Sequence, residues 1–146
     1  MNRFFLRKYN DILWFFGVSP RLTNNKIRGW YGEWLALRYL KKRSNFSILE
    51  KNWQSQRDAR REIDIVGLEK EILVFVEVRA RSANSLLSGY QSINRKKRNS
   101  IRLACKDFLY LYPKKFQNYR FDVIEVDLAE RKSNLFHHQN VSLFSP

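Results

Sequence analysis

Residues 62–79 carry the sequence EIDIVGLEKEILVFVEVR, and this stretch decides the fold. Its second half, residues 72–79, is rich in β-branched and aromatic residues, a composition typical of a central strand. In its first half, residues 62–66, side chains alternate between the two sides of a strand. The five residues 67–71 between these segments are enough for a short turn. We therefore predict an antiparallel β-hairpin.

Two acidic residues in this hairpin run against strand propensity. Asp64 lies in mid-strand, and Glu77 lies in the apolar second strand, where alternation puts it on the same face as Arg79. A turn at residues 70–71 would place Asp64 directly across from Glu77, whereas a turn at 69–70 would place it one same-face step away. In both registers the carboxylates leave one sheet face and repel each other. A divalent cation would relieve this repulsion, because Mg²⁺ binds one or two carboxylates together with water and phosphate. Salt bridges to arginine are the alternative.

The segments around the hairpin predict an α/β domain. Helical and strand periodicities alternate along the chain, so helices are expected to pack around one sheet. The predicted segments are helices at 26–42 and 93–112, strands at 46–53, 62–66, 72–79, 121–126 and 135–144, and loops at 54–61 and 80–91.

Residues 1–24 are predicted to form an amphipathic helical arm in front of the α/β domain, which spans residues 25–146. This arm could pack on its own domain, lie on a membrane surface or dock a partner. Its longest apolar run is residues 12–16, too short for a signal peptide or for the about 20 residues that cross a bilayer. We therefore expect no stable membrane insertion and a cytoplasmic location. The apolar stripe of the arm consists of Phe5, Tyr9, Ile12, Leu13 and Phe16.

The charge of the chain points to a polyanionic partner. Its 146 residues include 28 Lys plus Arg and 14 Asp plus Glu, a net charge of +14, while 44% hydrophobic residues support a folded core. One cysteine and two histidines exclude an internal disulfide and a zinc finger. We expect nucleic acid, most readily DNA, as the partner. The predicted phosphate contacts are Arg81, Arg95, Lys96, Lys97 and Arg98.

Two more charged residues interrupt apolar helix stripes. Glu33 lies between Trp30 and Leu37, where a boundary glutamate paired with an arginine and a functional carboxylate both fit. Lys97 follows Ile93 by four residues on the stripe of the second helix. It either reaches past the apolar surface into solvent or points at a phosphate near the carboxylates.

An ordered set of motifs connects these residues. The motifs are Gly32-Glu33-x-x-Ala36-x-x-Tyr39-Leu40, Ile48-Leu49-x-x-Asn52, Glu62-Ile63-Asp64-Ile65-Val66, Leu73-Val74-Phe75-Val76-Glu77-Val78-Arg79-x-Arg81, Lys97, and Arg120-Phe121-Asp122-Val123. Over about residues 26–127 the set resembles the YraN-like family of bacterial proteins. That family is similar to the PD-(D/E)xK endonuclease superfamily, which includes Holliday-junction resolvases.

The resemblance implies a restriction-endonuclease-like mixed sheet flanked by helices. It also implies Mg²⁺- or Mn²⁺-dependent hydrolysis of DNA phosphodiester bonds, with branched DNA as a candidate substrate and a homodimer as a candidate assembly. Glu33, Asp64, Glu77 and Arg79 would be catalytic, with Asp64 and Glu77 as the metal ligands. Arg79 stands where the motif has lysine, and arginine is effectively always protonated. A non-catalytic nucleic-acid-binding protein with the same fold is therefore the alternative.

Overall fold

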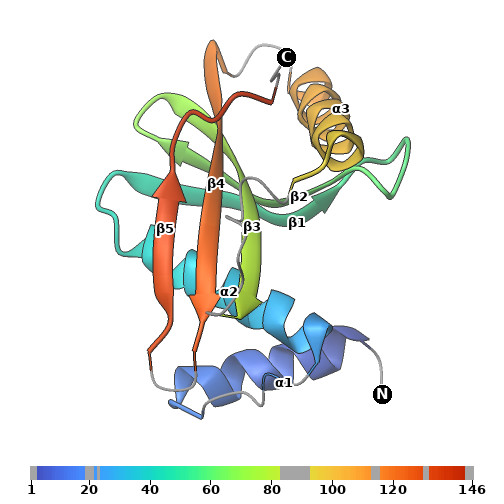
Figure 1. The fold of residues 1–146 in the computed structure, drawn as a ribbon. Coiled ribbons are helices and arrows are strands. Elements are labelled where there is room, and N and C mark those ends of the chain that lie inside the picture. Colours follow the sequence, from blue (N-terminus) through green and yellow to red (C-terminus); the bar gives the residue numbers. More distant parts are fainter. Residues whose placement is uncertain are drawn as a thin grey trace.

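The described residues fold around one five-stranded mixed β-sheet (Figure 1). The computed structural model describes residues 3–18, 22, 24–82, 93–112, 116–129 and 132–143. In chain order the elements are α1 (Arg3–Phe15), α2 (Asn25–Lys41), β1 (Phe46–Gln54), β2 (Glu62–Glu69), β3 (Ile72–Ser82), α3 (Arg95–Leu111), β4 (Asn118–Leu128) and β5 (Asn134–His138).

The strands lie in the order β1-β2-β3-β4-β5. β3 and β4 are parallel, and the other three neighbouring pairs are antiparallel. The parallel pair needs a crossover, which α3 provides. A mixed sheet flanked by helices confirms the predicted fold class, consistent with a restriction-endonuclease-like fold.

The helices α2 and α3 cover opposite faces of the sheet, as Figure 1 shows. Along β3, Val74 and Val76 pack in one core cluster with α2. Leu73 and Phe75 alternate with them and pack in a second cluster with α3. The same alternation places Glu77 on the α3 side, just beyond the apolar part of the strand.

The turn between β2 and β3 has the first of the two predicted registers. Glu69 pairs with Ile72, so residues 70–71 form the turn, and Lys70 adopts a φ of 55°. Positive φ at a central residue is typical of two-residue hairpin turns. The ladder continues from this turn as far as Ile65 opposite Val76.

A glycine lets α2 approach β3 closely. A Cβ at Gly32 would lie 2.3 Å from the Cβ of Ala80. Any larger residue would therefore push the helix off the strand. The close approach holds the next residue, Glu33, near the second half of β3.

The N-terminal helix packs on α2, but not through its predicted stripe. Trp14 is buried and makes edge contacts with Tyr31 and Trp34, at centroid distances of 5.0 and 5.9 Å. The large ring of Trp14 decides which flank of α1 turns inward.

No helix in the described parts of the chain is long and apolar enough to cross a bilayer. Three predicted stripe residues face solvent, namely Tyr9, Ile12 and Phe16, and the side chain of Phe5 lies outside the described residues.

The strands around the crossover are longer than predicted. β3 continues through Ser82, so the prediction of a loop at residues 80–91 is wrong at its beginning, and residues 83–91 lie outside the described residues. β4 starts at Asn118 rather than at residue 121. The extra residues at each strand end are too few and too mixed in polarity to show a strand periodicity in the sequence. Their strand conformation comes from pairing between β3 and β4, which runs from Ile72 to Ser82.

Candidate active site

Asp64 and Glu77 come together where β2 separates from β3. Pairing of the two strands ends at Ile65 and Val76, one step before these carboxylates would face each other. Asp64 instead uses its side chain, and its Oδ2 accepts a hydrogen bond of 2.7 Å from the backbone N–H of Val78. The two predicted metal ligands are therefore neighbours on adjacent strands, at a break in the ladder.

Glu77 is a nearly buried carboxylate, with 3% of its side chain exposed. Its Oε1 lies 3.2 Å from Lys97 Nζ and 3.8 Å from an Arg79 guanidinium nitrogen. Its Oε2 is buried and has no hydrogen-bond partner among the described residues. Burial and the charge of Asp64 raise the pKa of Glu77 to about 8, against the opposing effect of Lys97. Such a carboxylate needs a further positive partner to ionise fully at neutral pH.

Glu33 approaches Asp64 from α2. Arg7 of α1 donates to Glu33 Oε2 at 2.5 Å and to Asn52 Oδ1 at 3.1 Å. Burial, followed by the charge of Asp64, raises the pKa of Glu33 to about 7, while Arg7 lowers it. The pairing with arginine that the sequence left open is present, and Glu33 is also close enough to Asp64 to feel its charge.

Lys97 points into the site rather than into solvent. Its backbone N–H is capped by Asn94 Oδ1 at 2.8 Å, which fixes the first turn of α3. Its Nζ contacts Glu77 at 3.2 Å and lies 4.0 Å from Glu62 Oε1. Burial lowers the pKa of Lys97, but the charges of Glu77 and Asp64 raise it by more. The ammonium group therefore keeps its proton at neutral pH.

Arg81 does not stand free for a phosphate in this structure. It makes ion pairs with Glu125 at 3.0 Å and with Asp127 at 3.3 Å, both on β4. Only 18% of its side chain is exposed. A nucleic-acid contact by Arg81 stays a prediction, and it would require these ion pairs to rearrange.

The other predicted phosphate contacts lie on the first turn of α3. Arg95 and Lys96 are exposed there. Arg98 is partly buried, and its Nε donates to the carbonyl oxygen of Ile93 at 2.9 Å. These cations lie on the same helix turn as Lys97, beside the candidate site.

The carboxylate pair suits a divalent cation. Glu77 Oε2 lacks a partner within the described residues, and Asp64 and Glu77 repel each other. No group of three or more His, Cys, Asp or Glu within the described ranges is arranged to hold a metal. Asp64 and Glu77 would therefore supply two ligands, and water and substrate phosphate the others, as is common for Mg²⁺.

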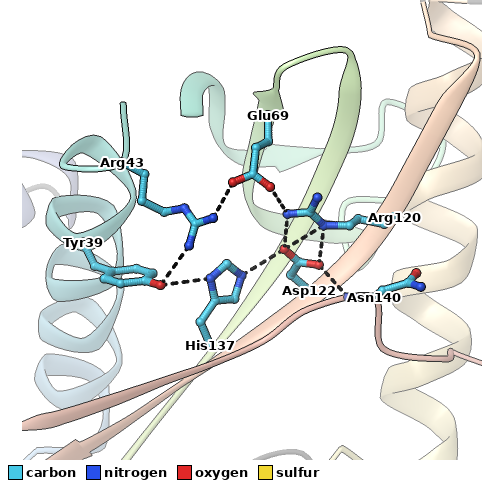
Figure 2. A network of polar contacts seen from close by, with 7 residues as sticks. All are labelled: Tyr39, Arg43, Glu69, Arg120, Asp122, His137 and Asn140. Atoms are coloured by element: carbon cyan, nitrogen blue, oxygen red, sulfur yellow. Dashed lines mark hydrogen bonds and ion pairs between the residues drawn. The ribbon is translucent and has the colours of Figure 1, made fainter. Parts of the chain in front are cut away.

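A second polar network, which the sequence analysis missed, lies on the other sheet face (Figure 2). Asp122 on β4 is fully buried and lies beside Val76 of β3, on the side of the sheet that α2 covers. It accepts hydrogen bonds of 2.9 Å from Arg120 Nε, from the backbone N–H of Asn140 and from His137 Nε2. The sequence held a signal for this network, because Arg120 and Asp122 are two residues apart in a strand and therefore share one sheet face.

The network extends from this aspartate to α2 and to the hairpin turn. Glu69 binds Arg120 at 2.6 Å and Arg43 at 2.5 Å. Arg43 donates to Tyr39 Oη at 3.2 Å, and Tyr39 lies 3.3 Å from His137 Nδ1. Because the network joins α2, β2, β4 and β5 and lies on the sheet face opposite to Glu77, we interpret it as structural.

Replacing Asp122 with Asn is expected to cost about 1–3 kcal/mol of unfolding free energy, because it removes one of the two carboxylates that bind the partly buried Arg120 and weakens the charged hydrogen bonds at this site. Burial raises the pKa of Asp122, but the bonds from His137 and Arg120 lower it by more, to below 3.8. Its contribution is therefore present above pH 3.8 and is lost as pH falls through the lower pKa of the folded state. Urea unfolding at pH 7 and along an acid series measures both effects. Glu71→Gln, an exposed turn variant, should leave stability unchanged, and an equal loss in both variants would contradict the structural role.

Comparison with known proteins finds a family that matches the part of the chain that holds Glu33, Asp64, Glu77 and Lys97. Residues 32–126 match the sequence model described as "Uncharacterised protein family UPF0102". A "UPF0102 protein" of Clostridium perfringens is 44% identical over 105 residues, which cover 70% of this chain and 81% of that protein. One of Alkaliphilus oremlandii is 36% identical over 118 residues, 80% of this chain and 97% of that protein. One of Acetivibrio thermocellus is 37% identical over 123 residues, 83% of this chain and 90% of that protein. The matched stretch begins at Gly32, so it contains the candidate site and leaves α1 outside.

Proposed function

This chain belongs to UPF0102, the YraN-like family in the PD-(D/E)xK-like nuclease superfamily, and we propose that it is a metal-dependent nuclease that hydrolyses DNA phosphodiester bonds. Branched DNA is its candidate substrate, a homodimer its candidate assembly and the cytoplasm its candidate location. The observation that carries this proposal is the carboxylate pair. Glu77 is buried with an unpartnered Oε2, and Asp64 lies beside it.

Mg²⁺ or Mn²⁺ held by Asp64 and Glu77 would supply an activated water and charge stabilisation at the scissile phosphate. The protein's own groups act around that centre. The protonated Lys97 stabilises negative charge on the phosphoryl oxygens and can donate a proton to the leaving oxygen. Arg79, on the same sheet face, adds a second fixed positive charge. Glu33 is the remaining candidate to orient or accept a proton from the attacking water, because its pKa is about 7.

The alternative function is nucleic-acid binding without cleavage. One observation favours it, because Arg79 occupies the motif position of a lysine and cannot act as a base. Lys97 weakens this objection, since it brings an amine within 3.2 Å of Glu77 from a different element. The net charge of +14 supports nucleic-acid binding under both proposals.

Incubation with labelled linear duplex, single-stranded and four-way-junction DNA is expected to give cleavage with Mg²⁺ or Mn²⁺ and none with EDTA. Binding should survive in EDTA, because the basic surface does not depend on the metal. Sedimentation in the same buffers tests the homodimer. If no substrate is cut with either metal while binding persists, the nuclease proposal fails and the binding protein stands.

A further inference from the structure

The outer side of α3 presents basic residues from its first turn as far as Lys106. Arg95, Asn99, Arg102, Lys106 and Tyr110 recur at spacings of three or four residues, which aligns them on one side of a helix. All five are exposed or partly exposed. The first and last residues of the row are fifteen positions apart, which is about 22 Å at 1.5 Å per residue. It starts at the helix end that carries Lys97 and runs away from the candidate site.

The loop between β1 and β2 is fixed against this helix. Buried Asp107 accepts a 2.6 Å bond from Ser55 Oγ and a 3.0 Å bond from an Arg61 guanidinium nitrogen. Nearer the N-terminal end of α3, Ser100 Oγ donates to the carbonyl oxygen of Arg60 at 3.0 Å. The loop is therefore held at two places along the helix and forms one continuous surface with it.

The fixed loop adds cations beside the helix row. Arg60 has 89% of its side chain exposed and Arg57 has 59%. Arg57 lies over the ring of Tyr110, 4.6 Å from its centroid. α3 has six basic residues and one acidic one, and residues 55–61 have three basic residues and one acidic one. We call this surface the α3 face, and it comprises Arg57, Arg60, Arg95, Asn99, Arg102, Lys106 and Tyr110.

We propose that the α3 face binds the phosphate backbone of a nucleic-acid duplex that runs along α3 from the candidate site. The link to catalysis rests on the proposed nuclease function, but the binding surface does not. At 3.4 Å per base pair, its length corresponds to roughly six base pairs. The face thus extends the predicted contacts at residues 95–98 to the far end of the helix.

The chemistry of the α3 face favours a duplex over a single strand. Proteins that bind single strands stack bases on open aromatic rings. Tyr110 is the one aromatic residue among the seven that define the face, and Arg57 lies over one side of its ring, so the face holds no row of rings on which successive bases could stack. The face therefore offers charges at fixed positions, which suits phosphates held at regular spacing.

The test compares two double variants that remove equal charge from opposite sides of the sheet. Arg102→Gln with Lys106→Gln alters the α3 face, whereas Lys41→Gln with Lys42→Gln alters exposed residues at the end of α2. Binding to a 20-base-pair duplex is measured by fluorescence anisotropy in EDTA from 0.05 to 0.3 M salt. Two lost phosphate contacts should reduce the log–log salt slope by about 1.8 and weaken binding roughly 60-fold at 0.1 M salt.

The control variant is expected to keep the wild-type slope, and thermal melts confirm that both variants are folded. If both double variants weaken duplex binding equally, binding responds to net charge alone, and the proposal that the α3 face binds the duplex is wrong. Tighter binding of a 20-nucleotide single strand than of the duplex would overturn the duplex assignment. Because EDTA excludes cleavage, a failed nuclease assay leaves this result unaffected, and a failed binding test leaves the carboxylate site unaffected.

Discussion

Replacing Asp64 with Asn, or Glu77 with Gln, is expected to remove Mn²⁺ binding and metal-dependent cleavage together while the protein stays folded. Each substitution removes one of two carboxylate ligands and preserves the side-chain shape. Substituting residues that only orient a metal ligand costs about 10–100-fold in metal affinity, so losing a ligand should cost more than about 100-fold. Calorimetric titration with Mn²⁺ measures the affinity, and cleavage should fall to the level seen with EDTA.

Although Glu77→Gln should abolish metal binding and cleavage, it should raise the stability of the metal-free protein at high pH. The pKa of Glu77 is about 8 in the folded protein against an ordinary 4.5, so the folded state retains a proton that the unfolded chain loses. Stability therefore falls as pH rises from 4.5 to 8, and Glu77→Gln removes that fall. We expect this variant to exceed the wild type at pH 8.5 by up to about 4 kcal/mol, measured by urea unfolding in EDTA.

Glu71→Gln is the matched control, because it makes the same exchange at an exposed turn position of the same hairpin. It should alter neither Mn²⁺ binding nor the pH dependence of stability. Unfolding of both the Asp64 and the Glu77 variants would show that the carboxylates serve a structural salt bridge to Lys97. That outcome would remove the metal site from the proposed function.

The hairpin that organises the site was predictable because its determinants are local. Alternation along residues 62–66 and the apolar run at 72–79 define both strands, and the structure selected between two stated registers. The break in the ladder was not predictable. It depends on the Asp64 carboxylate taking the backbone N–H of Val78, which a side-chain pattern does not report.

Contacts between distant segments account for what the sequence left open or missed. The position of Lys97 depends on where the first turn of α3 docks, and periodicity alone allowed both solvent and the site. The bond between His137 and Asp122 requires β5 to lie beside β4. Helical periodicity likewise detected an amphipathic α1 but chose the wrong flank, because the partner rings of Trp14 lie on α2.

Replacing Lys97 with Met is expected to lower metal-dependent cleavage by about 10²–10³-fold, the usual effect of removing one donor that stabilises transition-state charge. Lys96→Met is the matched control, since it removes the same charge one residue away from an exposed side chain. It should weaken DNA binding slightly and leave single-turnover cleavage of bound DNA unchanged. Because Lys97 keeps its proton, its loss should act on the rate constant more than on DNA affinity.

Substitutions at Arg79 test whether the ammonium group of the site has to come from Lys97 on α3. Arg79 lies on the same sheet face as Glu77, with a guanidinium nitrogen 3.8 Å from its Oε1, so a lysine there could replace the missing ammonium. Arg79→Lys alone should change cleavage little, but combined with Lys97→Met it should restore part of the lost rate. Rescue would show that the site needs one proton-donating amine and accepts it from either element. If Lys97→Met cleaves as fast as the wild type, the contact with Glu77 is structural. If neither the wild type nor Arg79→Lys cuts any DNA with Mn²⁺, the carboxylate site belongs to a binding protein.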